Sequence, residues 1–255
     1  MAKDKNFLDK IGEANKLFIL SPSGSRSTAK LKPIHGVIAK DIADMIGDNY
    51  EVISQGYGED KEKKVNGRYS DKNVDIAIID KQTEKVVSSI AVKFVMQNYS
   101  QNSKNYFENM LGETANIRKN NINYFQVFII PDKLPHYKKD KKTGEYIISY
   151  WEKFTDHNID QYIKLSEDNP NPNTNPHIPN NTLLYVIHIT PDVNDESVKT
   201  KKEYLEYYRN NTPNIILSEN KYPSFNEDGS VIYNNYEKFM NEVSNTVLSK
   251  KELTF

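Results

Sequence analysis

Two charged residues stand in stretches of sequence that are otherwise apolar. Asp75 is the second residue of "VDIAIID", residues 74 to 80, and Lys93 lies within "SSIAVKFVM", residues 88 to 96. Burying a charge is costly unless an opposite charge, a metal or a phosphate meets it. Lys93 therefore indicates a site in which a carboxylate, a metal-bound hydroxide or a phosphate lies beside an ammonium group.

The two charges form one site only if they point to the same face of a sheet. Side chains alternate along a strand, so Asp75 shares a face with Ala77, and Lys93 shares a face with Ala91. A connection of three or five residues places Asp75 opposite Ala91 and both charges on one face, whereas two or four residues send them to opposite faces. The alternative is that Asp75 caps the strand entry and Lys93 extends its ammonium group to water.

The elements around these residues follow from periodicity and turn residues. Apolar residues at helical spacing from Ile34 to Ile46 predict a helix that ends at Gly47. We further predict helices over 3–17, 103–119, 201–211 and 234–250, and strands over 50–57, 73–80, 86–96, 124–130 and 183–189. Residues 58–72 are expected to be a charged loop.

Strand, strand, helix, strand is the order of a mixed sheet with at least one crossover and a covering helix, so we predict an α/β fold with a central mixed sheet flanked by helices. No repeat or linker divides residues 1–255, which predicts one domain. The apolar runs are far shorter than the roughly 20 residues of a membrane span. The N-terminus lacks the apolar core of a secretory signal, and the expectation is a cytoplasmic protein without membrane contact.

The composition limits the chemistry. The chain has no cysteine, which removes disulfides and thiolate metal sites, so a metal needs oxygen or histidine ligands. The five histidines show no metal-ligand spacing such as HExxH. A net charge of -1 gives no overall attraction to nucleic acid. Only four arginines occur, which makes each one informative, since guanidinium is the usual reader of phosphates and guanine edges.

Asp75 lies one hairpin before Lys93, and Lys93 follows the small residue Ala91 by two positions. This pattern resembles the core of the PD-(D/E)XK nuclease superfamily, in particular its type II restriction endonuclease branch. The order of elements over roughly residues 30–130 is also similar to that core. The resemblance implies a restriction endonuclease-like sheet. It also implies that residues 135–255 add strands and helices for DNA binding or dimerisation.

The resemblance implies roles for individual residues. Asp75 would ligate Mg²⁺, the carbonyl of Val92 would be another ligand, and Lys93 would orient or activate the attacking water. Ala91 stands where the family has its second acid, and Val74 stands at the motif proline. Some restriction enzymes take this acid from the following helix.

Two glutamates of the predicted helix 103–119 could supply the missing acid. They are Glu108 and Glu113, and Glu113 is favoured because Gly112 permits close helix approach. The alternative is that both are ordinary solvated helix residues. If neither serves, the site holds metal weakly or is inactive.

The resemblance also implies that the end of this helix approaches the major groove of DNA. The candidate base-reading residues there are Asn116, Arg118, Lys119 and Asn120. Arg26 and Lys30, in an earlier loop, are candidates for phosphate contacts that position a protein without reading sequence. The alternatives are a polar helix end whose cations complement the helix dipole, and a flexible loop.

These inferences combine into the hypothesis of a Mg²⁺-dependent type II restriction endonuclease that cuts double-stranded DNA at a specific site. It is expected to act as a homodimer, because two-fold symmetry matches a palindromic site. A cognate DNA methyltransferase is expected in the same system. The rival hypotheses are a DNA-binding module that kept the fold and lost the chemistry, as Ala91 suggests, and a non-nucleic-acid α/β protein with a buried ion pair.

Overall fold

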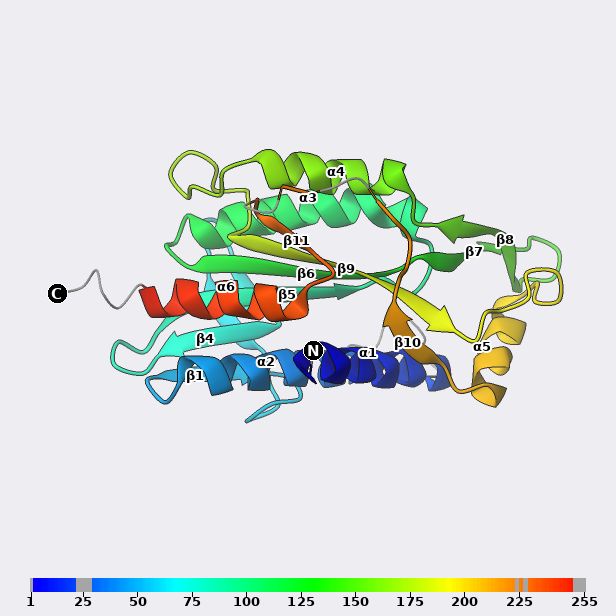
Figure 1. Ribbon diagram of the computed structural model, residues 1–255, viewed down its shortest axis with the longest axis horizontal. Helices are drawn as coiled ribbons and strands as arrows, with labels where there is room; N and C mark the ends of the chain where they lie inside the picture. The colour runs from blue at the N-terminus through cyan, green and yellow to red at the C-terminus, as the bar shows by residue number, and fades with distance from the viewer. Residues whose placement is uncertain (1, 22–28, 223–224, 227–228, 250–255) are drawn as a thin grey trace.

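The computed structural model describes residues 2–21, 29–222, 225, 226 and 229–249, and it centres on a mixed sheet of seven strands (Figure 1). The parallel strands of its middle are apolar almost throughout, as expected of strands covered on both faces. The order along the sheet is β1 (Tyr50–Ser54), β4 (Ile76–Asp80), β5 (Lys85–Phe94), β6 (Asn123–Pro131), β9 (Asn181–Thr190) and β10 (Asn214–Leu217), with β11 (Val231–Tyr233) also paired to β9.

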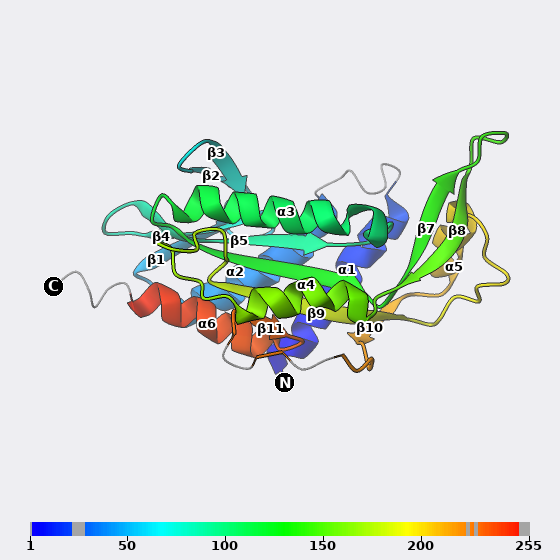
Figure 2. The same ribbon diagram turned by 90° about the horizontal axis from the view of Figure 1, so that it is seen from above.

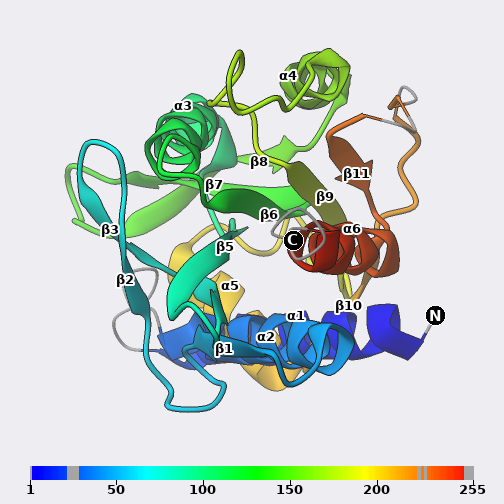
Figure 3. The ribbon, with the colours of Figure 1, turned by 90° about the vertical axis from the view of Figure 1, so that its left-hand side faces the viewer.

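Helices cover both faces of this sheet (Figure 3). Because side chains alternate along a strand, β6 sends Val127 and Ile129 to one core and Phe128 and Ile130 to the other. The first core packs on α1 (Ala2–Leu20), α2 (Lys32–Ile46) and α6 (Tyr236–Ser249), and the second packs on α3 (Tyr99–Arg118) and α4 (Asp156–Glu167). The short helix η2 (Ala29–Leu31) leads into α2, and α5 (Lys201–Asn210) packs against α1 and the second hairpin described below.

Two hairpins stand outside the central sheet. One consists of β2 (Lys63–Asn66) and β3 (Asp71–Val74), and the other of β7 (Lys133–Lys139) and β8 (Tyr146–Lys153). Figure 2 shows both hairpins extending from the same side of the molecule, with α3 between them. The hairpin of β2 and β3 thereby lies close to the sheet face on which Asp75 and Lys93 are found.

The predicted α/β fold with a mixed sheet is confirmed. The helix that ends at Gly47 is present, and Gly47 has a φ of 73°, which favours glycine. Two predictions were wrong in detail. The charged stretch 58–72 contains β2 and the start of β3, and the predicted strand 73–80 breaks at Asp75, because β3 pairs with β2 while β4 pairs with β1 and β5.

Further elements had no counterpart in the sequence-based prediction, among them α4, β7 and the two short strands β10 and β11. The strands β10 and β11 are only four and three residues long, too short for a periodic pattern to stand out. Among the described residues, none of the helices combines the length and the apolar character that crossing a bilayer requires.

Candidate functional site

The register between β4 and β5 decides whether Asp75 and Lys93 share a face. The turn between the strands has four residues, 81–84, which alone would send the two charges to opposite faces. The pairing shifts, however, from Ile79↔Val86 to Ile78↔Ser88, so that Val87 has no partner and forms a β-bulge. This extra residue restores the odd spacing, and both charges point to the face that α3 covers.

Asp75 lies in the gap between β3 and β4 and is held there by the backbone around it. Its Oδ2 accepts a hydrogen bond from the backbone N–H of Val92 at 2.7 Å, and its carbonyl accepts one from Ser54 Oγ at 2.8 Å. Burial raises the pKa of the Asp75 carboxyl, and the Val92 bond and the charges of Lys72 and Lys93 oppose that rise. Keeping Asp75 ionised here therefore costs free energy of folding.

Lys93 is the counterpart of Asp75 on β5. Its Nζ lies 4.2 Å from the centre of the Tyr106 ring, which holds the ammonium group by a cation–π contact. Within the described parts of the chain, no carboxylate lies at ion-pair distance from it. Burial lowers the pKa of Lys93, and the charge of Asp75 partly offsets this shift.

A pocket of about 270 Å³ joins these residues. Besides Asp75 and Lys93, Glu113 of α3 lines it, whereas Glu108 is exposed and does not. Glu113 forms an ion pair with Lys72 of β3, with 3.0 Å between Oε2 and Nζ. The other lining residues are Asn73, Ala91, Val92, Tyr106, Asn109, Met110, Tyr124, Gln126 and Phe128.

Gln126 is a pocket residue that the sequence analysis did not single out. It lies opposite Ala91 on the parallel strand β6, and its Nε2 donates to the Ala91 carbonyl at 3.2 Å. Its Oε1 accepts a hydrogen bond from the Tyr124 hydroxyl at 3.3 Å. The available signal was a single amide inside the apolar run "YFQVFII". Gln126 thus puts a polar side chain beside the position where the nuclease motif has its second acid.

The donor set of the pocket fits a hard cation. Asp75 and Glu113 each present a carboxylate to it, and Mg²⁺ is commonly bound by one or two carboxylates while it keeps several waters. In an extended strand, the N–H and the C=O of one residue point to the same edge of the strand. The Val92 N–H donates a hydrogen bond to Asp75, so the Val92 carbonyl also faces the Asp75 side of β5. No cluster of three or more histidine, aspartate or glutamate residues occurs in the described ranges.

Two of the residues predicted to read DNA bases are used inside the protein. Arg118 is buried, and its guanidinium donates to the carbonyls of Ile178 and Pro170. Asn116 is also buried, and its amide bonds the backbone of residues 69 and 70. These geometries correct the expectation that either side chain meets a groove of DNA. The two residues are two positions apart and lie on different sides of α3, and each packs against a different segment of the chain.

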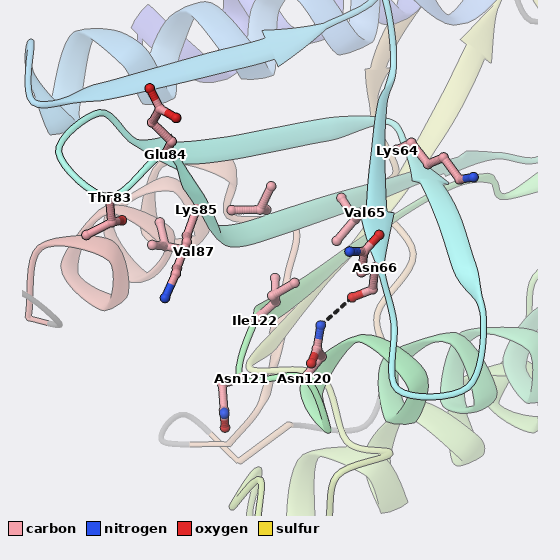
Figure 4. A pocket seen from close by; sticks show the side chains of 11 residues that line it. Lys64, Val65, Asn66, Thr83, Glu84, Lys85, Val87, Asn120, Asn121 and Ile122 are labelled. Atoms are coloured by element: carbon pink, nitrogen blue, oxygen red, sulfur yellow. Dashed lines mark hydrogen bonds between the residues drawn. The ribbon is translucent and has the colours of Figure 1, made fainter.

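The other predicted DNA contacts lie in different places. Lys119 is exposed at the end of α3, and Asn120 donates to the Asn66 carbonyl at 2.6 Å. Asn120 lines a second pocket, of about 600 Å³, together with Lys85 and Val87 from the start of β5 (Figure 4). Lys93 lies near the other end of that strand. Lys30 is buried against the Phe18 ring. Its burial lowers the pKa of Lys30, and the charge of Lys93 lowers that pKa further. Arg26 lies outside the described residues.

The position of Arg118 gives a stability prediction. Replacing Arg118 by methionine is expected to lower the free energy of unfolding by about 2 to 4 kcal/mol, because the buried Ile178 carbonyl and the partly buried Pro170 carbonyl lose a charged donor. Denaturation in urea measures the change. Arg209→Met is the control, since Arg209 is exposed on α5 and makes one 3.3 Å hydrogen bond to the Ile19 carbonyl. Equal losses in the two variants would contradict a structural role specific to Arg118.

Comparison of the chain with protein-family models, with curated proteins and with solved structures found no match. The residues of the pocket and the order of the elements that carry them are the features that bear on function.

Proposed function

We propose that this chain is a Mg²⁺-dependent endonuclease of the type II restriction class, which hydrolyses phosphodiester bonds in double-stranded DNA at a specific site. The observation that supports it most is the arrangement of Asp75, Lys93 and Glu113 around one pocket. They come from three different parts of the fold: Asp75 from the gap between β3 and β4, Lys93 from β5, and Glu113 from α3. Two carboxylates and an ammonium group held against a sheet are suited to a metal ion and the phosphate it neutralises.

Each pocket residue has a task in such a reaction. Asp75 and Glu113 would hold the cation together with the Val92 carbonyl, and bound Mg²⁺ supplies a water of lowered pKa and positive charge at the phosphate. Lys93 hydrogen-bonds the attacking water or a phosphate oxygen and stabilises the negative charge that develops there. The Tyr106 ring keeps its ammonium group within the pocket.

The rival proposal is a DNA-binding module that has the fold without the reaction. Two observations favour it: alanine at position 91 and the ion pair that Glu113 forms with Lys72. An ammonium group beside Glu113 competes with a metal for the same carboxylate. Lys72 is nevertheless about half exposed, with a side-chain exposure of 46%, so that it can turn toward solvent when a cation arrives.

Incubation of the purified chain with plasmid DNA and Mg²⁺ tests the proposal. Discrete fragments that require Mg²⁺ support the endonuclease, and binding without cutting favours the rival module. If the chain neither binds nor cuts DNA, Asp75 and Lys93 have no role in nucleic-acid chemistry. The further proposals of a homodimer, a cytoplasmic location and a cognate methyltransferase are tested by sedimentation, by fractionation and by the genes adjacent to this one.

The assignment of the second acid gives a separate prediction. Glu113→Gln is expected to reduce cleavage by about a hundredfold or more, because it removes one of two carboxylates from the pocket. Glu108→Gln is the matched control, since Glu108 lies on the same helix but is exposed and outside the pocket. Cleavage rates at saturating and limiting Mg²⁺ measure both. If Glu113→Gln cuts at the full rate, the acid has been assigned wrongly.

A further inference from the structure

The turn between β2 and β3, residues 67–70, displays two side chains to solvent. Tyr69 has a relative exposure of 80%, higher than that of any other large apolar side chain among the described residues. Its neighbour Arg68 is exposed as well. A tyrosine ring left in solvent buries no apolar surface, so it adds no hydrophobic stabilisation to the folded chain. Tyrosine and arginine are the residues most often found at the energetic centre of interfaces.

The backbone of this turn is held in one conformation by Asn116 of α3. The Asn116 Oδ1 accepts hydrogen bonds from the N–H groups of Tyr69 at 2.8 Å and Ser70 at 3.2 Å, and its Nδ2 donates to the Ser70 carbonyl at 2.8 Å. The Arg68 N–H donates to the Asn116 carbonyl at 2.8 Å. Gly67 lies so close that a Cβ there would be 2.2 Å from Asn116 Nδ2. The turn is therefore fixed while its side chains are left outside.

Arg68 differs from the other arginines of the described chain. Arg118 is buried against carbonyls, and Arg209 donates to the Ile19 carbonyl. Within the described ranges, Arg68 has no carboxylate at ion-pair distance, although its own hairpin carries Asp71, which pairs with Lys64 at 2.9 Å. The fixed backbone presents the Arg68 guanidinium to a bidentate acceptor from a defined position, so that binding has to order the side chain but not the turn.

The turn also lies close to the candidate catalytic pocket. Glu113, which lines the pocket, and Asn116, which holds the turn, are three residues apart on α3, a rise of about 4.5 Å on the same side of the helix. Lys72 of the same hairpin lines the pocket, and the four residues from Lys72 to Arg68 span at most about 13 Å. With about 3.4 Å between stacked bases, the turn is within about four base pairs of a phosphate in the pocket. Figure 3 shows the hairpin lying alongside α3.

We propose that this turn is a sequence-reading element, in which Arg68 bonds the edge of a base, most suitably guanine, in the major groove and Tyr69 packs against the adjoining base or sugar. This inference rests on the proposed function. A two-stranded ribbon fits the major groove, and the arginine fork matches the two acceptors of guanine. Asn116 is then a positioning residue that acts through the turn.

Selection from a pool of random-sequence duplexes tests the inference, with Ca²⁺ in place of Mg²⁺ and the full chain as the binding protein. Affinity for the selected duplex is then compared between Arg68→Gln and Arg209→Gln, which remove the same charge from exposed arginines. Arg68→Gln should bind the selected duplex about tenfold to a hundredfold more weakly and should lose its preference at one base pair. Arg209→Gln should keep both properties.

Two further variants separate reading from folding. Tyr69→Ala should weaken binding by about fivefold or more, whereas Leu248→Ala, at another exposed apolar side chain, should not. Asn116→Ala should lose the same base preference as Arg68→Gln, and adding Arg68→Gln to it should cause little further loss. A purely structural role of Asn116 would lower affinity for all sequences alike.

The outcomes distinguish this inference from the proposed function. Equal binding and equal preference in Arg68→Gln and Arg209→Gln overturn the inference even if the protein cuts DNA. A uniform loss of affinity, with the salt dependence reduced by about one unit in slope, identifies a phosphate contact and overturns base reading. If the protein shows a base preference that depends on Arg68 but does not cleave DNA in Mg²⁺, the endonuclease proposal is contradicted and base reading by the turn is supported.

Discussion

Replacing Asp75 by asparagine is expected to slow DNA cleavage by about a hundredfold to a thousandfold while leaving DNA binding in Ca²⁺ nearly unchanged. Asparagine keeps the acceptor for the Val92 N–H, so the backbone at the strand break is retained and only the charge is lost. Single-turnover cleavage of plasmid DNA measures the effect. Asp71→Asn is the matched control, because Asp71 is exposed on the same hairpin and pairs with Lys64.

The same substitution should stabilise the protein near neutral pH. Burial raises the folded-state pKa of Asp75 above its ordinary value of 3.8, so folding favours the protonated form. The stability from this preference is present below pH 3.8 and is lost as the pH rises through the folded-state pKa. Asp75→Asn removes the penalty, and its advantage over the unmodified chain should shrink as the pH falls through the folded-state pKa and should be absent below 3.8. A loss of stability at pH 7 would contradict this account.

Lys93→Met is the second variant with a large expected effect. Under the proposed function it removes the cation that would meet a phosphate or the attacking water, and we expect cleavage to fall by about a hundredfold to a thousandfold. Methionine has similar length and packs against the Tyr106 ring, which limits any disturbance of the fold. Lys85→Met is the control, since Lys85 is exposed at the start of the same strand. Equal cleavage by the two variants would remove Lys93 from the reaction.

Lys93→Met should also raise the free energy of unfolding at neutral pH. Burial lowers the pKa of Lys93 below 10.5, so the folded state disfavours its charged form, and that cost disappears only as the pH rises toward 10.5. Two substitutions that slow cleavage strongly and yet increase stability would identify charges that are kept for chemistry, since functional sites commonly trade stability for activity. Urea denaturation at pH 7 decides this point.

Some features of the site could be read from the sequence because they depend on local patterns. Asp75 and Lys93 stood out as charges within apolar stretches of sequence. The end of the helix at Gly47 followed from the glycine itself. The mixed α/β sheet followed from the order of elements, because parallel strands need crossovers. Glu113 was favoured over Glu108, and it is the one that lines the pocket.

The sequence did not predict the hairpin of β2 and β3. Its strands alternate charged and apolar residues weakly, and only Val65 and Val74 are buried in it. The contacts that hold it come instead from the distant residues Asn116 and Asn120 of the α3 end. A segment stabilised by such long-range hydrogen bonds carries little local signal, and Arg68 and Tyr69 were missed for the same reason.

The sequence by itself determined which residues carry charge into the sheet, and it determined the fold class that surrounds them. Only the tertiary structure decided which of them meet. A single β-bulge at Val87 turned Asp75 to the face of Lys93. The rotation of α3 faced Glu113 and Asn116 toward the chain while Glu108, five residues and about 140° around the helix from Glu113, faces solvent. Register and helix rotation depend on packing between distant segments, which no local pattern encodes.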